Sequence, residues 1–317
     1  MSEQPTVVLP KVAAEVLPSI GVVLPTHNRP ELMRRALESI LAQDYAGPLR
    51  VVVVFDRAEP DLSLVRGGDR PIEVVTNTRV PGLAGARNSG IAAVRTDLVA
   101  FCDDDDVWHP GKLRRQAEAL SGDPDAEMAT CAIEVDYDGQ VSPRLAGQSR
   151  VAVGDLARSR MAMLHSSTFV LRRSALLGQL GLVAEDAPGS QNEDWDLLLR
   201  ASRRRPIVHV DEPLVRVLWG RTSLFASAYD TKIASLRWML DRHPEIRDSR
   251  VGAARVYGQL ACWHAASGQR REAVRWAGRA LRSHWREPRA VIAFAAAAGV
   301  VKVPTVLSAL HKRGRGI

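Results

Sequence analysis

Four consecutive carboxylates, Asp103–Asp106, follow the apolar run Leu98–Cys102, which predicts a short buried strand. Like charges gathered at the end of a strand repel one another, so a positive charge must offset them. A divalent cation bound through carboxylate oxygens would do so. The alternative is a solvated acidic turn, in which Asp106 caps the following helix, Gly111–Leu120, or His109-Pro110 begins it.

A second pair of carboxylates, Glu193 and Asp194, precedes the apolar residues Trp195, Leu198 and Leu199, whose spacing predicts one face of a helix. A carboxylate at the start of a helix can serve as a general base, because burial and neighbouring charges tune its pKa. The alternative is that both carboxylates merely interact favourably with the helix dipole.

Polar residues also follow two other predicted strands. Ile20–Leu24 runs into the polar turn Pro25–Pro30, and Leu49–Phe55 stops at Asp56. Strands that alternate with helices in this rhythm predict a parallel sheet. Ligands of such sheets bind beyond the carboxyl ends of the strands. The turn, Asp56 and Asp103–Asp106 are therefore expected to converge on one crevice.

Further elements are expected on both sides of these residues. The apolar spacing from Glu31 to Leu41 predicts a helix, and Val80–Ala93 is punctuated by glycine and then helical. Val151–Met163 is either a connecting helix or an irregular arm. Strands are expected at Ile72–Val75, Glu127–Tyr137 and Ser167–Leu171, with edge strands at Ile207–Val210 and Leu214–Leu218.

The composition is that of a soluble globular protein. The chain has 317 residues, of which 46% are hydrophobic and 25% charged, enough for a large core. A net charge of +7 is modest, and aromatic residues make up only 5%, so nucleic acid is not expected as a partner. The three scattered cysteines suit a reducing, cytoplasmic location.

Five elements, in this order, resemble the family-2 glycosyltransferases of the GT-A fold. The resemblance covers residues 18–225, and it implies an α/β catalytic domain with a Rossmann-like, mostly parallel central sheet. The elements are Pro25–Arg29, Asp56, Gly85–Gly90, Phe101–Pro110 with Lys112, Leu113 and Gln116, and Asn192–Trp195 with Leu198–Arg200.

The resemblance implies transfer of a sugar from a nucleoside-diphosphate sugar, with Mn²⁺ or Mg²⁺ as cofactor. Asp103-Asp104-Asp105 looks like the family's Asp-x-Asp motif, in which Asp105 would ligate the metal and Asp103 would contact the ribose or the metal shell. Because Asp104 and Asp106 are carboxylates too, the residues that match the motif could be shifted by one position. The residues implied to bind the nucleotide-sugar are Pro25, Thr26, His27, Arg29, Asp56, Arg87, Asp103 and Asp104.

Asn192-Glu193-Asp194 resembles the family's Glu-Asp motif, which makes Asp194 the first choice as general base and Glu193 the reserve. A single base without a second nucleophile implies inversion at the anomeric carbon. Trp195, Trp219 and His165 are expected on the acceptor side, and Arg216 and Arg221 on a loop over the diphosphate.

Two departures from the family pattern concern the substrates. Phe55–Ala58 replaces the family's Asp-Asp-Gly-Ser-like turn, and the Gly-Gly-Phe-Asp-Glu-like stretch is reduced to Gly181-Leu182 with Glu185 and Asp186. The donor is expected to be a UDP-sugar, with dTDP- and GDP-sugars as alternatives. The acceptor is a glycan, a lipid-linked molecule or a small molecule.

Residues 1–17 are expected to form a leader and residues 226–317 a helical region. Ala261–Leu281 resembles one tetratricopeptide-like hairpin, which packs on the catalytic domain or serves a homodimer or acceptor contact. The apolar run Ala290–Val301 and the basic stretch His311–Arg315 would suit a peripheral membrane contact, or a buried helix with a solvated tail.

Two other functions compete with glycosyl transfer. The chain could be a sugar-nucleotide-binding or scaffold protein with a vestigial acidic site. It could also be a nucleotidyltransferase, although that class would need a glycine-rich loop after the first strand, and Pro25–Pro30 offers none.

Overall fold

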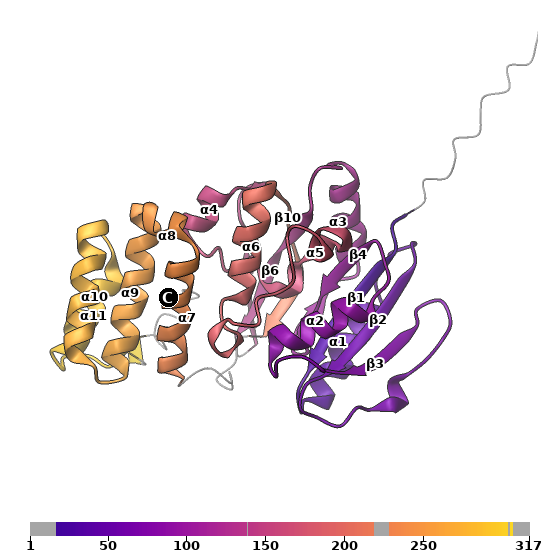
Figure 1. Ribbon diagram of the computed structural model, residues 1–317, viewed down its shortest axis with the longest axis horizontal. Helices are drawn as coiled ribbons and strands as arrows, with labels where there is room; N and C mark the ends of the chain where they lie inside the picture. The colour runs from indigo at the N-terminus through magenta and orange to yellow at the C-terminus, as the bar shows by residue number, and fades with distance from the viewer. Residues whose placement is uncertain (1–16, 138, 219–227, 304, 307–317) are drawn as a thin grey trace, which may run out of the picture.

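The computed structural model describes residues 17–137, 139–218, 228–303 and 305–306, and its centre is one mixed sheet with a helical region beyond one edge (Figure 1). Two further strands extend it: β7 (Gln140–Arg144) pairs with β6 (Met128–Tyr137), and β8 (Arg150–Val151) pairs with β10 (Ile207–Leu218). Across the sheet the order is β3 (Ile72–Thr76), β2 (Leu49–Phe55), β1 (Ile20–Thr26), β4 (Leu98–Phe101), β9 (Val170–Arg172), β6 (Met128–Tyr137), β10 (Ile207–Leu218) and β5 (Val107–Trp108).

The first four strands of this order are parallel, as the sequence predicts. In their register Thr26 lies opposite Phe55, and Val23 lies opposite Phe101. The chain therefore leaves β1, β2 and β4 at the same edge of the sheet, where ligands of parallel sheets bind. The other half is mixed, because β9 runs antiparallel to both β4 and β6.

Helices cover both faces of the sheet. The helices α1 (Pro30–Leu41) and α3 (Lys112–Ser121) pack with Val22 of β1, whereas α2 (Leu83–Ala93) and α6 (Glu193–Arg204) pack with Val23. Neighbouring residues of a strand point to opposite faces, so a strand buried on both faces reads as a continuous apolar run. Shorter segments are α4 (Val153–Arg158), α5 (Arg173–Leu177) and 3₁₀ turns at Leu62–Leu64, Ser166–Thr168 and Pro188–Ser190.

The prediction of two edge strands, Ile207–Val210 and Leu214–Leu218, is wrong. These residues form one strand, β10, which lies between β6 and β5. Its pairing with β6 shifts register on either side of Pro213, which has no N–H to donate. An irregularity inside a continuous strand therefore looked like a break between two strands.

The C-terminal part is helical, as expected. Its helices are α7 (Tyr229–Arg242), α8 (Pro244–Asp248), α9 (Arg250–Ala266), α10 (Arg270–Ser283) and α11 (Pro288–Ala297). The helix α9 contacts α4, α7, α10 and α11. The buried carboxylate of Asp196 on α6 joins this region to the sheet domain, since it accepts hydrogen bonds from Arg242 at 2.7 Å and His243 at 3.0 Å.

No helix in the described part of the chain is long and apolar enough to cross a membrane. The basic stretch His311–Arg315, residues 1–16 of the expected leader and the expected boundary at residue 225 lie outside the described residues.

Candidate functional site

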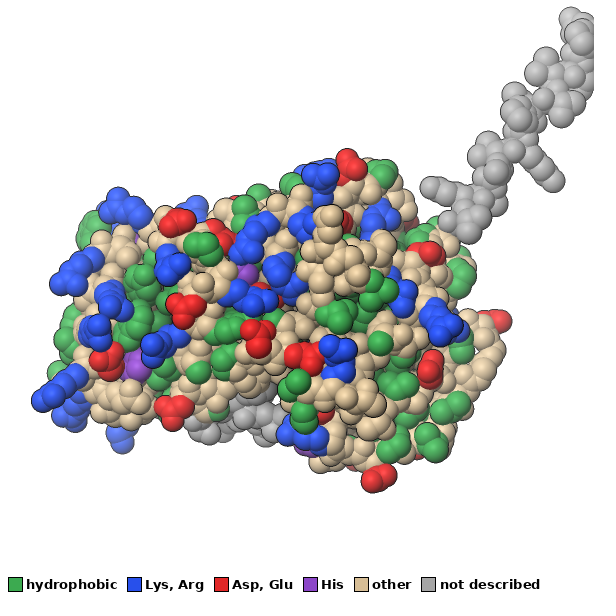
Figure 2. Space-filling view, viewed as in Figure 1, with side chains coloured by type: hydrophobic (Ala, Val, Ile, Leu, Met, Phe, Trp, Pro, Cys, Tyr) green, Lys and Arg blue, Asp and Glu red, His purple; other side chains and the backbone are tan. Residues whose placement is uncertain are grey.

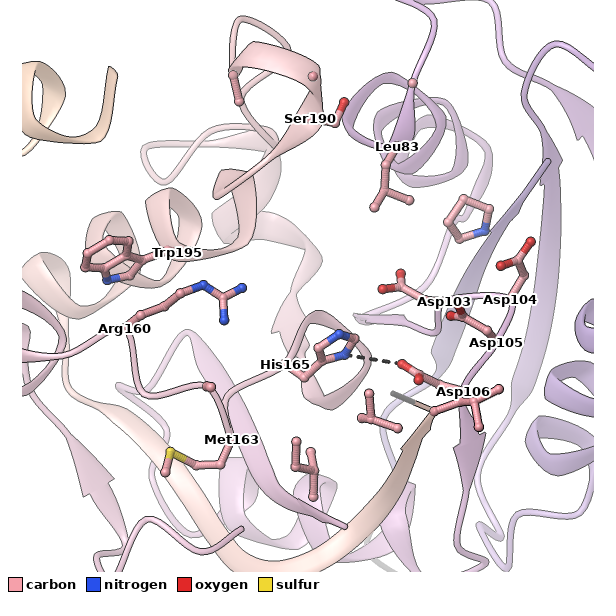
Figure 3. Close-up of a pocket in the computed structure, with 18 of the residues that line it drawn as sticks. Leu83, Asp103, Asp104, Asp105, Asp106, Arg160, Met163, His165, Ser190 and Trp195 are labelled. Atoms are coloured by element: carbon pink, nitrogen blue, oxygen red, sulfur yellow. Dashed lines mark ion pairs between the residues drawn. The ribbon is translucent and has the colours of Figure 1, made fainter. Parts of the chain in front are cut away.

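A cavity of about 1560 Å³ lies at the carboxyl edge of β1, β2 and β4 (Figure 3). The turn after β1 and the carboxylates after β4 form one side of it. The segment after α4 and residues of α9 and α11 form another. The residues singled out from the sequence that line it are Pro25, Thr26, His27, Arg29, Asp56, Asp103, Asp104, Asp105, His165 and Trp195.

Two of the four consecutive carboxylates bind the turn after β1. Asp104 accepts hydrogen bonds from Thr26 Oγ1 at 2.9 Å and Arg29 Nη1 at 3.2 Å, and Asp105 pairs with the same Nη1 at 2.7 Å. Burial raises the pKa of both carboxyl groups, and the charges of the neighbouring aspartates raise that of Asp105 further. One arginine therefore does not balance the negative charge here.

Asp106 does not cap the next helix, so that expectation is wrong. The helix α3 begins at Lys112 after Gly111, and the Asp106 carboxylate turns back instead to Ser167 Oγ at 2.5 Å and His165 Nδ1 at 3.2 Å. Burial would lower the pKa of His165, but Asp106 and Asp103 raise it to about 9. At neutral pH His165 is thus a cation beside two carboxylates.

These side chains fit a divalent cation. One ligand atom each from Asp103, Asp106 and His165 lie within 4.8 Å of one another. Carboxylate oxygens suit Mg²⁺ and Mn²⁺, and imidazole nitrogen is a further donor once it loses its proton. Asp105, the metal ligand expected from the sequence, lies next to this group but is paired with Arg29.

Arg87 connects the carboxylates to α6. Its guanidinium is fully buried and donates from Nη2 to Asp103 at 2.6 Å and from Nη1 to Glu193 at 2.5 Å. Burial lowers the pKa of Arg87, but the two carboxylates more than offset this, so it stays charged. The sequence assigned Arg87 to the nucleotide. The structure places it behind the cavity wall, between the two acidic motifs.

Asp194 is not among the residues that line the cavity, and its link to the cavity is its ion pair with Arg160. Its Oδ2 pairs with Arg160, whose side chain points into the cavity opposite Asp103–Asp105 (Figure 3). Its Oδ1 accepts the Trp195 backbone N–H at 2.7 Å, and the indole of Trp195 donates to the Leu156 carbonyl. The Asp194 side chain is 9% exposed.

Asp56 has little hydrogen-bonding capacity left for a ligand. It accepts from Asn77 Nδ2 at 2.7 Å, from the Gly82 N–H at 3.1 Å and from Arg57 Nε at 3.1 Å. These bonds lower the pKa of Asp56 although burial acts in the opposite direction. His27 Nδ1 lies 2.7 Å from the Asp56 backbone carbonyl, so the turn after β1 and the end of β2 support each other.

Not every expected residue reaches the cavity. Arg216 pairs with Glu134 at 2.6 Å and is not among the lining residues, and Trp219 and Arg221 lie outside the described residues. Conversely, sequence reasoning missed Arg160, which holds the candidate base. It also missed Ser166 and Ser167, whose hydroxyls donate to Asp103 and Asp106. None of these belongs to a motif, and only the fold brings them here.

Known proteins resemble this chain in sequence and in fold. Residues 21–177 match the family model described as "Glycosyl transferase family 2". The amylovoran biosynthesis glycosyltransferase AmsB of Erwinia amylovora is 27% identical over 262 residues, which cover 75% of this chain and 82% of AmsB. The UDP-Glc:alpha-D-GlcNAc-diphosphoundecaprenol beta-1,3-glucosyltransferase WfgD of Escherichia coli is 29% identical over 102 residues, 32% of this chain and 40% of WfgD.

A solved structure shares the fold. Residues 1–349 of TarS from S. aureus, in complex with UDP-GlcNAc, match with a TM-score of 0.60 at 16% identity. The match covers 94% of this chain and 92% of that one. The fold is the GT-A fold expected from the sequence, with a helical C-terminal region.

Proposed function

This chain belongs to glycosyltransferase family 2 and is a glycosyltransferase, and we propose that it transfers a sugar from a nucleoside-diphosphate sugar to an acceptor hydroxyl with inversion at the anomeric carbon. We further propose that the reaction depends on Mn²⁺ or Mg²⁺ bound at the carboxylates after β4. Asp194 is the proposed general base.

One observation carries this proposal. Asp103–Asp106 line one side of a cavity, and Arg160, the ion-pair partner of Asp194, points into the same cavity from the opposite side (Figure 3). A displacement at a sugar carbon needs a base for the incoming hydroxyl on one side and charge stabilisation for the leaving group on the other. The cavity has room for both substrates.

The proton of the acceptor hydroxyl would pass to Asp194. The Trp195 N–H and Arg160 fix the orientation of this carboxylate, and its side chain is nearly buried, so water competes little for it. Glu193 is less suited to the role, because its carboxylate is directed to buried Arg87. A single displacement by the hydroxyl inverts the anomeric carbon.

The proposed cation lies at Asp103, which belongs both to the Asp-x-Asp pair with Asp105 and to the group with Asp106 and His165. When bound, such a cation stabilises the charge that develops on the departing diphosphate. Thr26 and Arg29 hold Asp104 and Asp105 in place, and Ser166 and Ser167 hold Asp103 and Asp106.

Similar proteins support a UDP-sugar as donor and a cell-envelope glycan as acceptor. The TarS structure contains UDP-GlcNAc, the name of WfgD specifies UDP-Glc and a diphosphoundecaprenol acceptor, and AmsB is named for amylovoran biosynthesis. We also propose a cytoplasmic location, in keeping with three cysteines that are all free and buried.

The test is a thermal-shift screen of UDP-, dTDP- and GDP-sugars with Mn²⁺ and with a chelator. Hydrolysis of the sugar–phosphate bond in the same mixtures is measured alongside. A UDP-sugar should stabilise the protein and be hydrolysed slowly, and both effects should disappear with the chelator. Stabilisation that is equal with and without Mn²⁺ would contradict metal dependence.

A further inference from the structure

The cavity extends beyond the two acidic motifs to a group of arginines from the helical region. Arg158 ends α4, Arg255 lies on α9 and Arg289 on the first turn of α11, and all three line the same cavity as Asp103–Asp105. We refer to Arg158, Arg255 and Arg289 as the arginine cluster.

Positive charge alone does not make this a site, since Lys and Arg side chains are spread over the helical end of the molecule on the face that Figure 2 shows. The arginine cluster differs in being crowded and poorly neutralised. Among the described residues, neither Arg158 nor Arg255 has a carboxylate within ion-pair distance, and Arg289 pairs with Glu287 at 2.7 Å. Three cations therefore share one carboxylate.

The packing holds these charges together at a cost. Arg255 is half-buried and donates to the Arg158 backbone carbonyl at 2.9 Å. Burial, followed by repulsion from Arg289 and Arg158, lowers the pKa of Arg255. The Nε atom of Arg289 is buried and has no hydrogen-bond partner in the described part of the chain. The three guanidinium groups repel one another, and a bound anion would offset this repulsion.

Glycines on α9 permit this arrangement. A Cβ on Gly252 would lie 1.9 Å from the Ala157 carbonyl oxygen, and one on Gly258 would lie 2.9 Å from Arg289 Cβ. The two glycines lie six residues apart, and Arg255 lies between them, on the face of α9 that meets α4 and α11. The close approach of the three elements thus depends on residues without side chains.

The arginine cluster is adjacent to the proposed base. Arg158 and Arg160 are separated by one residue, so their Cα atoms lie at most about 7 Å apart. Arg160 pairs with Asp194, and both arginines line the cavity. An anion bound at the cluster would therefore lie on the acceptor side, away from the carboxylates that would repel it.

We propose that the arginine cluster binds a phosphate or diphosphate group of the acceptor, attached to the sugar whose hydroxyl is presented to Asp194. Guanidinium groups suit this role because they donate paired hydrogen bonds to phosphate oxygens and stay charged when partly buried. This inference rests on the proposed function, since it takes the base side of the cavity as the acceptor site.

The test uses the full-length chain saturated with UDP and excess Mg²⁺, so that the donor site is filled. Inorganic phosphate and farnesyl diphosphate are titrated against sodium chloride of equal ionic strength, with the melting temperature as readout. Both phosphates should raise it. Arg255→Gln should weaken their binding about tenfold or more, because a charge-assisted hydrogen bond is lost, and Arg255→Lys should recover part of it. UDP affinity should not change.

The matched control is Arg271→Ala, an exposed arginine of α10 that does not line the cavity; it should bind both probes like the wild type. Equal phosphate binding by wild type and Arg255→Gln would overturn the inference. Phosphatidylglycerol vesicles are titrated in the same way. Binding to the vesicles alone would also overturn the inference, because it would make the cluster a contact with the lipid surface. If the wild type does not bind UDP in the presence of Mg²⁺, the proposed function itself is wrong. If it binds UDP normally but its phosphate binding does not depend on Arg255, only this inference is wrong.

Discussion

Glu193 and Asp194 are neighbours in the chain, yet their carboxylates bind different arginines on different sides of the cavity wall. Glu193 Oε1 accepts a 2.5 Å hydrogen bond from buried Arg87, and Asp194 Oδ2 pairs with Arg160, which lines the cavity. The structure thus directs Glu193 to a buried arginine and Asp194 to an arginine of the cavity wall, a distinction that the sequence motif leaves open.

The first prediction concerns these two carboxylates. Asp194→Asn should keep UDP and metal binding but reduce sugar transfer by about 10²–10⁴-fold, the usual contribution of a general base. Glu193→Gln should instead lower the free energy of unfolding by about 3–5 kcal/mol, because it leaves Arg87 with one carboxylate fewer. Transfer assays and urea unfolding of both variants check this. Normal transfer by Asp194→Asn would show that the base is another group.

The second prediction identifies the metal ligands. If the Asp-x-Asp pair holds the cation, Asp105→Asn should abolish Mn²⁺-dependent UDP binding and Asp106→Asn should leave most of it. If Asp103, Asp106 and His165 hold it, the order is reversed. Calorimetric titration of UDP into each variant, with Mn²⁺ or with chelator, decides between them. Equal binding in both variants, with and without Mn²⁺, would exclude a metal at these carboxylates.

The third prediction is a pH dependence of Mn²⁺ binding. Without a bound metal, Asp106 and Asp103 favour the charged form of His165 and raise its pKa to about 9. A protonated imidazole repels a cation. Mn²⁺ affinity should therefore rise from pH 7 to 9, about tenfold per unit for one released proton. In His165→Asn the affinity should be nearly flat over this range. A wild-type affinity independent of pH would contradict the proximity of metal and imidazole.

The fourth prediction concerns acid stability. Although burial acts against it, hydrogen bonds from His243, Arg200 and Arg242 lower the pKa of Asp196 from 3.8 to about 2. Because the pKa of Asp196 is lower in the folded protein than in the unfolded chain, its ionised carboxylate stabilises the fold at any pH above the unfolded-chain pKa. This contribution to the free energy of unfolding, about 2 kcal/mol, is lost as the pH falls from about 4 to about 2. Denaturant unfolding between pH 2 and 5 should show a steeper loss for wild type than for Asp196→Asn. If wild type and Asp196→Asn lose stability equally as the pH falls, the Asp196 carboxylate is not the group responsible.

The fifth prediction compares two helical glycines. Gly252→Ala should lower the free energy of unfolding by about 1–3 kcal/mol, since the new Cβ would overlap the Ala157 carbonyl. Gly278→Ala on α10 meets nothing within 4 Å and should be stabilising by about 0.5–1 kcal/mol. Urea unfolding of both variants measures the difference. A harmless Gly252→Ala would mean that α9 and α4 are less closely packed than the structure has them.

The elements that the sequence predicts well are those whose signal is local. The run Leu49–Phe55 is β2 to the residue, and the acidic motif follows β4 as expected, because a strand buried on both faces leaves an uninterrupted apolar pattern. The convergence of the turn after β1, Asp56 and Asp103 follows from the parallel register of β1, β2 and β4.

What the sequence could not reveal depends on contacts between distant parts of the chain. Asp106 resembled a helix cap because α3 follows it, but its partners, His165 and Ser167, lie about sixty residues away. The arginine cluster comes from α4, α9 and α11, and none of its three arginines belongs to a sequence motif. The two-residue strand β5 pairs only because β10 runs alongside it, so its own sequence gives no signal.

The bridge that Arg87 makes between Asp103 and Glu193 also bears on the order in which substrates bind. A cation bound with the donor would compete with Arg87 for the Asp103 carboxylate. Arg87 would then interact mainly with Glu193, at the start of the helix that carries Asp194. Donor binding would in this way be coupled to acceptor binding, and thermodynamic linkage would make the coupling equal in both directions. A positive coupling of this kind would limit the time that a bound donor is exposed to water without its acceptor.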